Sequence, residues 1–291
     1  MNIVVFGGAG FLGSHVCDKL SEVGHSVTIF DIRESPYKRD NQEMIVGDIL
    51  DAESIRLAIK GKDIVFNFAG IADIEEAKTK PLDTVRYNVL ANVMILDECR
   101  LANVSRFVYA STVYVYSKVG GFYRASKQAS ELYIENYLEQ YNLDYTILRY
   151  GSLYGPRSDE KNGIYRFIKQ ALTEGEIHYY GTENALREYI HVEDAARLSV
   201  EILKPKYKNQ HIVITGTEML KVSQLFQMLR EITNKDFNIF YETSNDHPHY
   251  EMVPYSYMPK VGMKLVNPYH VDLGQGLIQV VETVDHEHSN K

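Results

Sequence analysis

Cysteine is scarce in this sequence of 291 residues, which contains only Cys17 and Cys99. The two lie far apart on predicted helices and match no metal-ligand or redox spacing. Two histidine pairs near the C-terminus lack a third ligand at a recognisable spacing: His247 and His249, and His286 and His288. We therefore expect a reduced protein without a metal site, with these histidines in a polar loop and a frayed tail.

Long apolar runs and runs of like charge are also missing. No apolar stretch approaches membrane-spanning length, and the N-terminus enters its first predicted strand without a basic region or apolar signal segment. Lys and Arg number 31 against 39 Asp and Glu, a net charge of −8 that disfavours a nucleic-acid backbone as partner. We expect a cytoplasmic protein with neither a membrane nor a nucleic acid as partner.

Glycines are concentrated where the first predicted strand ends. An apolar run at residues 2–6 is followed by glycines at positions 7, 8, 10 and 13, and then by an amphipathic helix to about residue 23. The spacing fits Gly8-x-Gly10-x-x-Gly13 or Gly7-x-x-Gly10-x-x-Gly13. Such a turn lets a pyrophosphate approach the free N–H groups of a helix N-terminus, which predicts dinucleotide binding.

An acidic residue supports this interpretation. The second predicted strand ends in Asp31, where a carboxylate accepts hydrogen bonds from the adenosine ribose hydroxyls. The same carboxylate repels a 2′-phosphate, so we predict NAD as the cofactor. Arg33 nearby leaves NADP as the alternative.

Strands and helices alternate through the first half of the chain. Strands are predicted at 43–46, 63–68, 106–111 and 144–148, and helices at 51–60, 82–101 and 123–141. This alternation predicts an α/β fold with a Rossmann-type, doubly wound parallel sheet whose ligands lie at the carboxyl ends of the strands. After about residue 155 the pattern loosens into longer loops. We predict an NAD-binding domain at 1–155 and a smaller substrate-binding lobe at 156–291, with some segments returning to the first domain.

Tyr123-x-x-x-Lys127 is a candidate proton-transfer pair. Residues four apart stack on one face of a helix, which holds the ammonium beside the phenol. A charge ~6 Å away at a dielectric of ~20 gives ~2.8 kcal/mol, which brings the pKa of Tyr123 from ~10 towards ~8. With 22 Tyr in the chain the pair alone is a weak signal.

Taken together, the motifs resemble an extended short-chain dehydrogenase/reductase of the NAD-dependent sugar-nucleotide epimerase/dehydratase family. The ordered segments that carry the resemblance are the glycine turn 7–13, Asp31, 47–49, 67–70, 88–89, 111–116, 123–127, 148–157 and 187–194.

The resemblance implies roles for single residues. Tyr123 would be the base, Lys127 would bind the nicotinamide ribose, and Thr112 would hydrogen-bond the reacting hydroxyl, with Ser111 as the fallback. Asp48 and Ile49 would lie by the adenine and Arg187 on the substrate diphosphate. The cofactor-binding set is Gly7, Gly10, Phe11, Leu12, Gly13, Asp31, Ile32, Asp48, Ile49, Phe68, Ala69, Gly70, Tyr123, Lys127 and Tyr150. The substrate-binding set is Ser111, Thr112, Ser152 and Arg187.

Three departures from the family pattern limit what can be carried over. Val113 and Tyr114 stand where 4,6-dehydratases of this group have acids, so dehydration is not expected. The segment 113–122 is shorter than usual, which predicts a more open pocket. Gly151-Ser152 replaces the aromatic-asparagine pair of the group's epimerases.

We predict an NAD-dependent epimerase of a nucleotide-activated sugar, acting through a transient keto sugar, at C4 in our interpretation. A keto-sugar nucleotide reductase or dehydrogenase is the first alternative, and a non-enzymatic NAD-binding regulator is the second. The family resemblance also implies a role in polysaccharide biosynthesis. The helices at 83–102 and 123–141 carry apolar residues on the side away from the sheet, and this side needs a second cover. The family resemblance implies that these helices pair between two copies, so we predict a homodimer, with cover by the chain's own loops as the alternative.

Overall fold

The computed structural model describes residues 1–242 of the chain. The histidine pairs at 247–249 and 286–288 and the end of the predicted lobe lie outside the described residues. No helix among residues 1–242 is long and apolar enough to cross a membrane.

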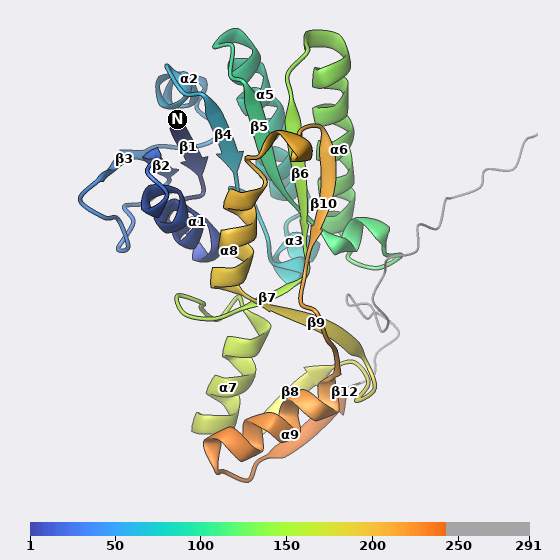
Figure 1. Cartoon of the computed structure of the whole chain (residues 1–291). Helices are drawn as coiled ribbons and strands as arrows, with labels where there is room; N and C mark the ends of the chain where they lie inside the picture. The colour runs from blue at the N-terminus through green and yellow to red at the C-terminus, as the bar shows by residue number, and fades with distance from the viewer. Residues whose placement is uncertain (243–291) are drawn as a thin grey trace, which may run out of the picture. The chain divides into compact units, whose positions relative to one another are not determined.

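A seven-stranded parallel sheet with the order β10-β6-β5-β4-β1-β2-β3 forms the larger layer (Figure 1). Its strands are β1 (Asn2–Phe6), β2 (Ser26–Asp31), β3 (Gln42–Val46), β4 (Ile64–Asn67), β5 (Arg106–Thr112), β6 (Tyr145–Tyr150) and β10 (Gln210–Ile214). Neighbouring strands end near one another: Phe6 pairs with Phe30 and Asn67, and Thr112 pairs with Tyr150. The predicted α/β fold with a doubly wound parallel sheet is confirmed.

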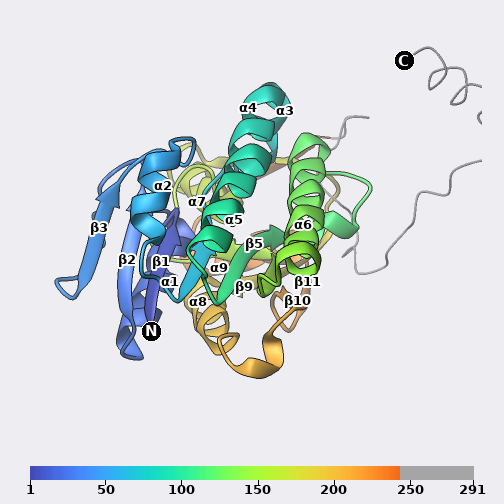
Figure 2. The same cartoon turned by 90° about the horizontal axis from the view of Figure 1, so that it is seen from above.

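Helices cover both faces of this sheet, so its strands are apolar on both sides. Val4 and Phe6 point to a core shared with α2 (Ala52–Ile59), α5 (Ala91–Leu101) and α6 (Gly121–Tyr141). Ile3 and Val5 alternate with them and point to a core shared with α1 (Phe11–Glu22) and α8 (Val192–Glu201). Figure 2 shows α2, α5 and α6 along one face. Because the described parallel strands end together, their carboxyl ends form one edge.

Local signals placed several elements correctly. Gly24, with φ +86°, follows Val23, the C-cap of α1, and the Asp51 carboxylate caps α2 by accepting from the amides of Glu53 and Ser54. The helix predicted at 82–101 is α4 (Pro81–Val85), a π-helical turn (Arg86–Leu90) and α5 in succession. The short helix α3 (Ile74–Thr79) was not predicted.

The expectation of longer loops after residue 155 is wrong for the described part of the chain. Between 152 and 242 lie β7 (Ser152–Tyr154), α7 (Gly163–Thr173), β8 (Glu176–Tyr180), β9 (Leu186–His191), β11 (Met219–Lys221), α9 (Val222–Thr233) and β12 (Asn238–Glu242). A separate apolar core centred on Phe226 and Ile177 joins α7, α9 and the two-stranded sheet β12-β8. The strands in this part of the chain are short and have polar ends, so the sequence pattern did not reveal them. α8 and β10 follow residue 155 in the sequence but pack with the large sheet. The domain boundary at residue 155 therefore stays a prediction.

Candidate active site

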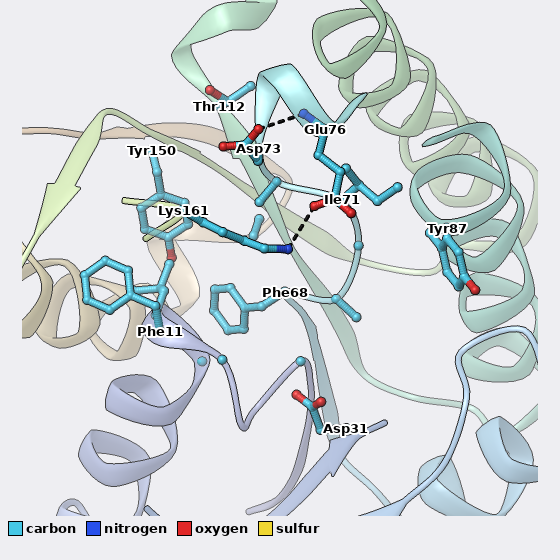
Figure 3. A pocket seen from close by; sticks show the side chains of 18 of the residues that line it. Phe11, Asp31, Phe68, Ile71, Asp73, Glu76, Tyr87, Thr112, Tyr150 and Lys161 are labelled. Atoms are coloured by element: carbon cyan, nitrogen blue, oxygen red, sulfur yellow. Dashed lines mark hydrogen bonds and ion pairs between the residues drawn. The ribbon is translucent and has the colours of Figure 1, made fainter. Parts of the chain in front are cut away.

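A cavity of about 750 Å³ opens at the carboxyl edge of the large sheet (Figure 3). The ends of β1, β2, β4, β5 and β6 contribute to its wall, together with the segment 151–162 that follows β6. Most residues of the predicted cofactor and substrate sets line it: Gly7, Gly10, Phe11, Leu12, Gly13, Asp31, Ile32, Asp48, Ile49, Phe68, Ala69, Gly70, Ser111, Thr112, Tyr123, Lys127 and Tyr150. Residues that lie far apart in the sequence, from position 7 to position 150, thus line one cavity.

The glycine turn at one end of the cavity leaves no room for side chains. A Cβ on Gly13 would lie 2.2 Å from the Gly7 carbonyl oxygen, and Gly7 itself has φ +76° with a Cβ position 2.7 Å from the Ala69 nitrogen. Gly10 also lines the cavity, whereas Gly8 does not. Of the two spacings that the sequence allowed, the structure therefore favours Gly7-x-x-Gly10-x-x-Gly13.

The first turn of α1 follows these glycines. Gly10 is the N-cap, and no side chain caps the helix there. A helix N-terminus without a capping side chain keeps amide N–H groups for an anion, and the missing Cβ atoms let a pyrophosphate approach. The turn therefore fits the diphosphate of a dinucleotide.

The acid at the end of β2 lies beside this turn. An Asp31 carboxylate oxygen accepts from the Ala9 amide at 3.0 Å, so the side chain is held at the cavity wall. Arg33 lines the cavity as well. Asp48 accepts from the Leu50 amide at 2.9 Å, and Ile49 beside it is buried. The arrangement fits an adenosine between these segments.

Tyr123 and Lys127 occupy the middle of the cavity, on the first turns of α6. The Lys127 Nζ lies 5.9 Å from the centre of the Tyr123 ring, close to the separation expected from the helical spacing. The same Nζ donates to the Ala110 carbonyl oxygen at 2.8 Å. Both side chains are buried.

The predicted pKa of Tyr123 near 8 is wrong. Burial raises the pKa of Tyr123 to about 12, against which only a hydrogen bond with Thr112 acts. Burial also lowers the pKa of Lys127 to about 8, although the Glu131 carboxylate opposes this. The sequence-based argument counted the attraction of the two charges and left out the cost of taking both from water.

Thr112 and Ser111 end β5, and they have different partners. The Thr112 Oγ1 accepts from the Tyr114 amide at 3.2 Å and hydrogen-bonds Tyr123. Ser111 instead donates to a Glu131 carboxylate oxygen at 2.5 Å. The Thr112 hydroxyl is therefore the one directed to the Tyr123 oxygen, whereas the Ser111 hydroxyl is held by Glu131.

Glu131 and Arg149 were not predicted as part of the site. The Arg149 guanidinium holds Glu131 with two hydrogen bonds, from Nε at 3.0 Å and from an Nη at 2.6 Å. The pair braces Ser111 on β5 against α6. Position 131 lies four residues after Lys127, on the same helix face, which is the signal that could have identified it.

Tyr150 closes the inner wall at the end of β6. Its hydroxyl shares a hydrogen bond of 2.6 Å with the Ser199 hydroxyl, and burial raises its pKa. The Tyr150 and Phe68 ring centres are 6.4 Å apart. These rings offer an apolar contact for a nicotinamide.

Two predicted substrate residues are not brought to the cavity. Neither Ser152 nor Arg187 lines it in the described part of the chain. Arg187 is buried on β9, where its guanidinium donates to the Leu186 carbonyl oxygen and, at 3.1 Å, to the Tyr179 hydroxyl. The arginine therefore supports its own lobe in this structure.

Charged side chains at the other end of the cavity were missed. Asp73 and Glu76 reach it from the start of α3, and Lys161 from the loop before α7 (Figure 3). Asp159 of the same loop also lines it. The spacing Asp-x-x-Glu at 73–76 is a helix-start pattern and could have predicted α3. No local signal in the sequence marks Lys161.

The residues directly after Thr112 form a 3-10 helix, Val113–Tyr116. Val113 is buried, and the Tyr114 ring lies edge-on to the Tyr123 ring with 6.4 Å between their centres. An aromatic face and an aliphatic side chain therefore stand at these two positions beside the candidate base. Among residues 1–242 there is no group of three His, Cys, Asp or Glu side chains that could hold a metal ion.

Comparison with known proteins gives concordant results. The family model described as NAD dependent epimerase/dehydratase family matches residues 3–215. A protein named putative UDP-glucose 4-epimerase from Methanocaldococcus jannaschii is 29% identical, covering 78% of this chain and 81% of its own. A UDP-N-acetyl-alpha-D-glucosaminuronate decarboxylase from Bacillus cytotoxicus is 27% identical, with 96% of each chain covered. The crystal structure of Thermus thermophilus UDP-glucose 4-epimerase in complex with NAD has a TM-score of 0.80 at 25% identity, covering 90% of this chain and 95% of that one.

Proposed function

The chain belongs to the NAD-dependent epimerase/dehydratase family, and from this premise we propose that it is an NAD-dependent 4-epimerase of UDP-activated sugars. The observation that carries the proposal is the meeting of Tyr123, Lys127 and Thr112 in a cavity whose other end fits a dinucleotide. Relatives with this name and a solved neighbour with NAD support it.

The chemistry of each residue follows from its position. NAD, when bound, would accept a hydride from the sugar carbon and return it to the opposite face of the ring. Tyr123 accepts the sugar hydroxyl proton as a phenolate, so its phenol must first release its own proton to solvent; the accepted proton returns to the sugar oxygen in the second step. Because burial raises the pKa of Tyr123 to about 12, its phenolate is a strong base, and the hydrogen bond with Thr112 favours this form.

Thr112 directs the proton transfer. Its hydroxyl hydrogen-bonds Tyr123 and is positioned to contact the oxygen that changes from hydroxyl to ketone. Lys127 is anchored by the Ala110 carbonyl at the end of β5, which fixes the distance between the two reacting side chains. Both groups are buried, so competing proton exchange with water is limited.

Elimination of water from the sugar is not supported. Dehydration needs an acid and a base near the ring in addition to the tyrosine, and the neighbouring positions hold Val113 and Tyr114. Val113 is buried and the Tyr114 ring packs against the Tyr123 ring, so neither of these two positions supplies a carboxylate. The proposal is therefore epimerisation.

Proton NMR of purified protein incubated with UDP-glucose and a catalytic amount of NAD tests this function. We expect UDP-galactose to accumulate to an equilibrium mixture while the absorbance of NADH at 340 nm stays near zero. Stoichiometric NADH formation, or no conversion of either UDP-sugar, would overturn the proposal. A one-way dehydrogenase would give the first of these results.

The assembly that we propose is a homodimer formed through α4, α5 and α6. Apolar side chains are exposed on these helices and on the π-helical turn between α4 and α5: Leu82, Val85, Leu90, Leu101, Leu132 and Tyr133. Leu132, Tyr133 and Tyr137 line a second hollow of about 420 Å³ on α6. Two such faces meeting around a two-fold axis would cover this apolar surface and brace the helix of Tyr123. That the protein acts in the cytoplasm and in polysaccharide biosynthesis stays a prediction.

Leu132→Asp tests the dimer. Leu132 is 60% exposed, and a carboxylate there would be buried in the paired interface, so we expect monomers by sedimentation velocity at micromolar concentration. Leu57→Asp on α2 is the matched control, because Leu57 is 59% exposed and lies away from α6. A monomeric wild type would contradict the proposal.

A further inference from the structure

Lys127 is a titratable group in a buried position beside Tyr123. Burial lowers the pKa of Lys127 to about 8. Its Nζ donates to the Ala110 carbonyl oxygen at 2.8 Å and lies 4.7 Å from the centre of the Tyr109 ring, and neither of these partners carries a net charge. Burial therefore favours the neutral amine of Lys127 over the ammonium.

The proposed reaction is served by the ammonium. Tyr123 takes the sugar proton as a phenolate, and a cation 5.9 Å from the centre of its ring stabilises that negative charge, whereas a neutral amine does not. An ammonium also makes stronger hydrogen bonds to ligand hydroxyls than an amine does. A negative charge near Lys127 therefore supports turnover, because it opposes the effect of burial.

Glu131 supplies a negative charge at this place. It lies four residues after Lys127 on α6, and residues at this spacing share one face of a helix. The Glu131 side chain is 7% exposed, and its carboxylate acts to raise the pKa of Lys127 against the effect of burial. Glu131 does not line the cavity, so its effect on the reaction must pass through its neighbours.

Two strands of the large sheet hold the Glu131 carboxylate. The Ser111 hydroxyl of β5 donates to one carboxylate oxygen at 2.5 Å. The Arg149 guanidinium of β6 donates to both oxygens, from Nε at 3.0 Å and from an Nη at 2.6 Å. Ser111 and Arg149 are paired in the register of these strands, which brings their donors to the same carboxylate. An ionised carboxylate accepts at both oxygens and matches these donors.

Arg149 is fixed by further contacts. Its guanidinium donates to the Tyr116 hydroxyl, and an Nη lies 2.7 Å from Nδ1 of His211 on β10. Because a guanidinium has no acceptor atom, this His211 nitrogen must be the unprotonated one. The other ring nitrogen of His211 lies 3.0 Å from a Glu135 carboxylate oxygen. The pair of Arg149 and Glu131 is therefore built into the fold and differs from an exposed ion pair.

We propose that Glu131 is a positioning residue for Lys127. Fixed by Ser111 and Arg149, its carboxylate holds a negative charge one helical turn from the lysine and so keeps the lysine an ammonium. This inference rests on the proposed function, because it takes the Tyr123 phenolate as the base. Removing the charge of Glu131 shifts Lys127 towards the amine and slows the reaction most at high pH.

An NMR titration of the full-length protein, labelled with carbon-13 at the lysine Cε atoms, tests the charge without a bound cofactor. The Lys127 signal is identified by its loss in Lys127→Arg, and in the wild type it should titrate at about pH 8. In Glu131→Gln the midpoint should fall by about one unit or more, since the amide has a similar size but no charge. In Glu131→Asp, which keeps the charge, the midpoint should fall by less.

Glu135→Gln is the matched control, because it is the same substitution one turn further along α6. Glu135 is 37% exposed and pairs with His211, so its loss should leave the Lys127 midpoint unchanged. If Glu131→Gln does not fold, Glu131→Gln combined with Arg149→Gln removes both charges of the buried pair, and the midpoint should fall there too. A wild-type midpoint in the folded variant without the Glu131 charge, or an equal shift in Glu135→Gln, overturns the inference.

Turnover of UDP-glucose against pH gives the functional readout. For a shift of one unit, Glu131→Gln should be about fivefold slower than the wild type at about pH 8 and close to it at about pH 6, where Lys127 regains its proton. KM for UDP-glucose should stay unchanged. A loss by the same factor at every pH indicates a merely structural role and overturns the inference. A wild type that turns over no UDP-sugar overturns the proposed function, while the NMR titration still decides whether Glu131 sets the charge of Lys127.

Discussion

The cofactor end of the cavity is built mainly from backbone, whereas the substrate end is built from side chains of distant segments. Gly7, Gly10 and Gly13 have no Cβ atoms, which leaves space for a ligand and keeps the first backbone amides of α1 accessible to it. At the other end, Glu76 and Lys161 meet from opposite walls. A backbone site needs only one short stretch of chain, while a side-chain site needs the whole fold.

The difference teaches which properties of the enzyme can vary. A dinucleotide-binding site formed by the backbone tolerates almost no substitution of its glycines, because an added Cβ atom would clash with neighbouring backbone atoms. The charged substrate end can be changed one side chain at a time without altering the sheet. Tyr123 and Lys127 line the same cavity, where the sugar would meet the cofactor.

Removing the residue where the ends meet should have the largest effect. Tyr123→Phe removes the proton acceptor but keeps the ring and its packing. Turnover of UDP-glucose should fall by at least ~10², since a positioned acid or base supplies typically ~10²–10⁴-fold. Steady-state kinetics measure the loss, and an unchanged NAD titration serves as the control. Near wild-type turnover would show that another group accepts the proton.

Gly13→Ala should damage the cofactor end selectively. Its Cβ would lie 2.2 Å from the Gly7 carbonyl oxygen, so the turn must shift away from the pyrophosphate. We expect NAD affinity to fall by about fivefold or more, as a backbone strain of ~1–3 kcal/mol implies. Gly163→Ala is the control, because the atom nearest to its Cβ is 3.7 Å away. NAD affinity kept in Gly13→Ala would show that the dinucleotide lies elsewhere.

Asp31→Ala should change cofactor choice within that end. The carboxylate at the cavity wall would accept from the ribose hydroxyls, and its loss should weaken NAD binding by about tenfold. Calorimetry with NAD and NADP measures the preference, which in the wild type should favour NAD. Tighter binding of NADP to the wild type would shift the role to Arg33.

The titration of the Tyr123 phenol has the smallest expected effect, because it is followed by absorbance and involves no change in turnover. With a pKa of about 12, the buried phenol stays protonated well above neutral pH. The difference in 295 nm absorbance between wild type and Tyr123→Phe should therefore show no phenolate step between about pH 7 and about pH 10. A step near pH 8 would restore the value that the helical spacing alone suggested.

Most of the fold and the cofactor end could be predicted from the sequence. Strand-helix alternation, the glycine turn and Asp31 are local patterns, and the structure places them as expected at the ends of β1 and β2. The expectation that Lys127 and Tyr123 lie on one face of a helix also agrees with the structure, where the Lys127 Nζ is 5.9 Å from the centre of the Tyr123 ring. Local geometry was reliable wherever one element contained the whole signal.

The substrate end could not be predicted in this way. Glu76 belongs to a helix-start pattern that says nothing of the cavity, and Lys161 carries no motif. Only the packing of the loop before α7 against α3 brings the two side chains together. Arg187 has a familiar sequence context, yet its guanidinium is directed to Leu186 and Tyr179. The pKa of Tyr123 failed for a similar reason, because burial depends on the whole fold.

UDP-glucose carrying deuterium at C4 of the glucose tests the central claim most directly, namely that one cavity removes a hydride and returns it to the same carbon. With the wild type and catalytic NAD, the account predicts UDP-galactose that keeps the deuterium at C4, observed by NMR and mass spectrometry. Deuterium lost to solvent, or left in accumulated reduced cofactor, would contradict it.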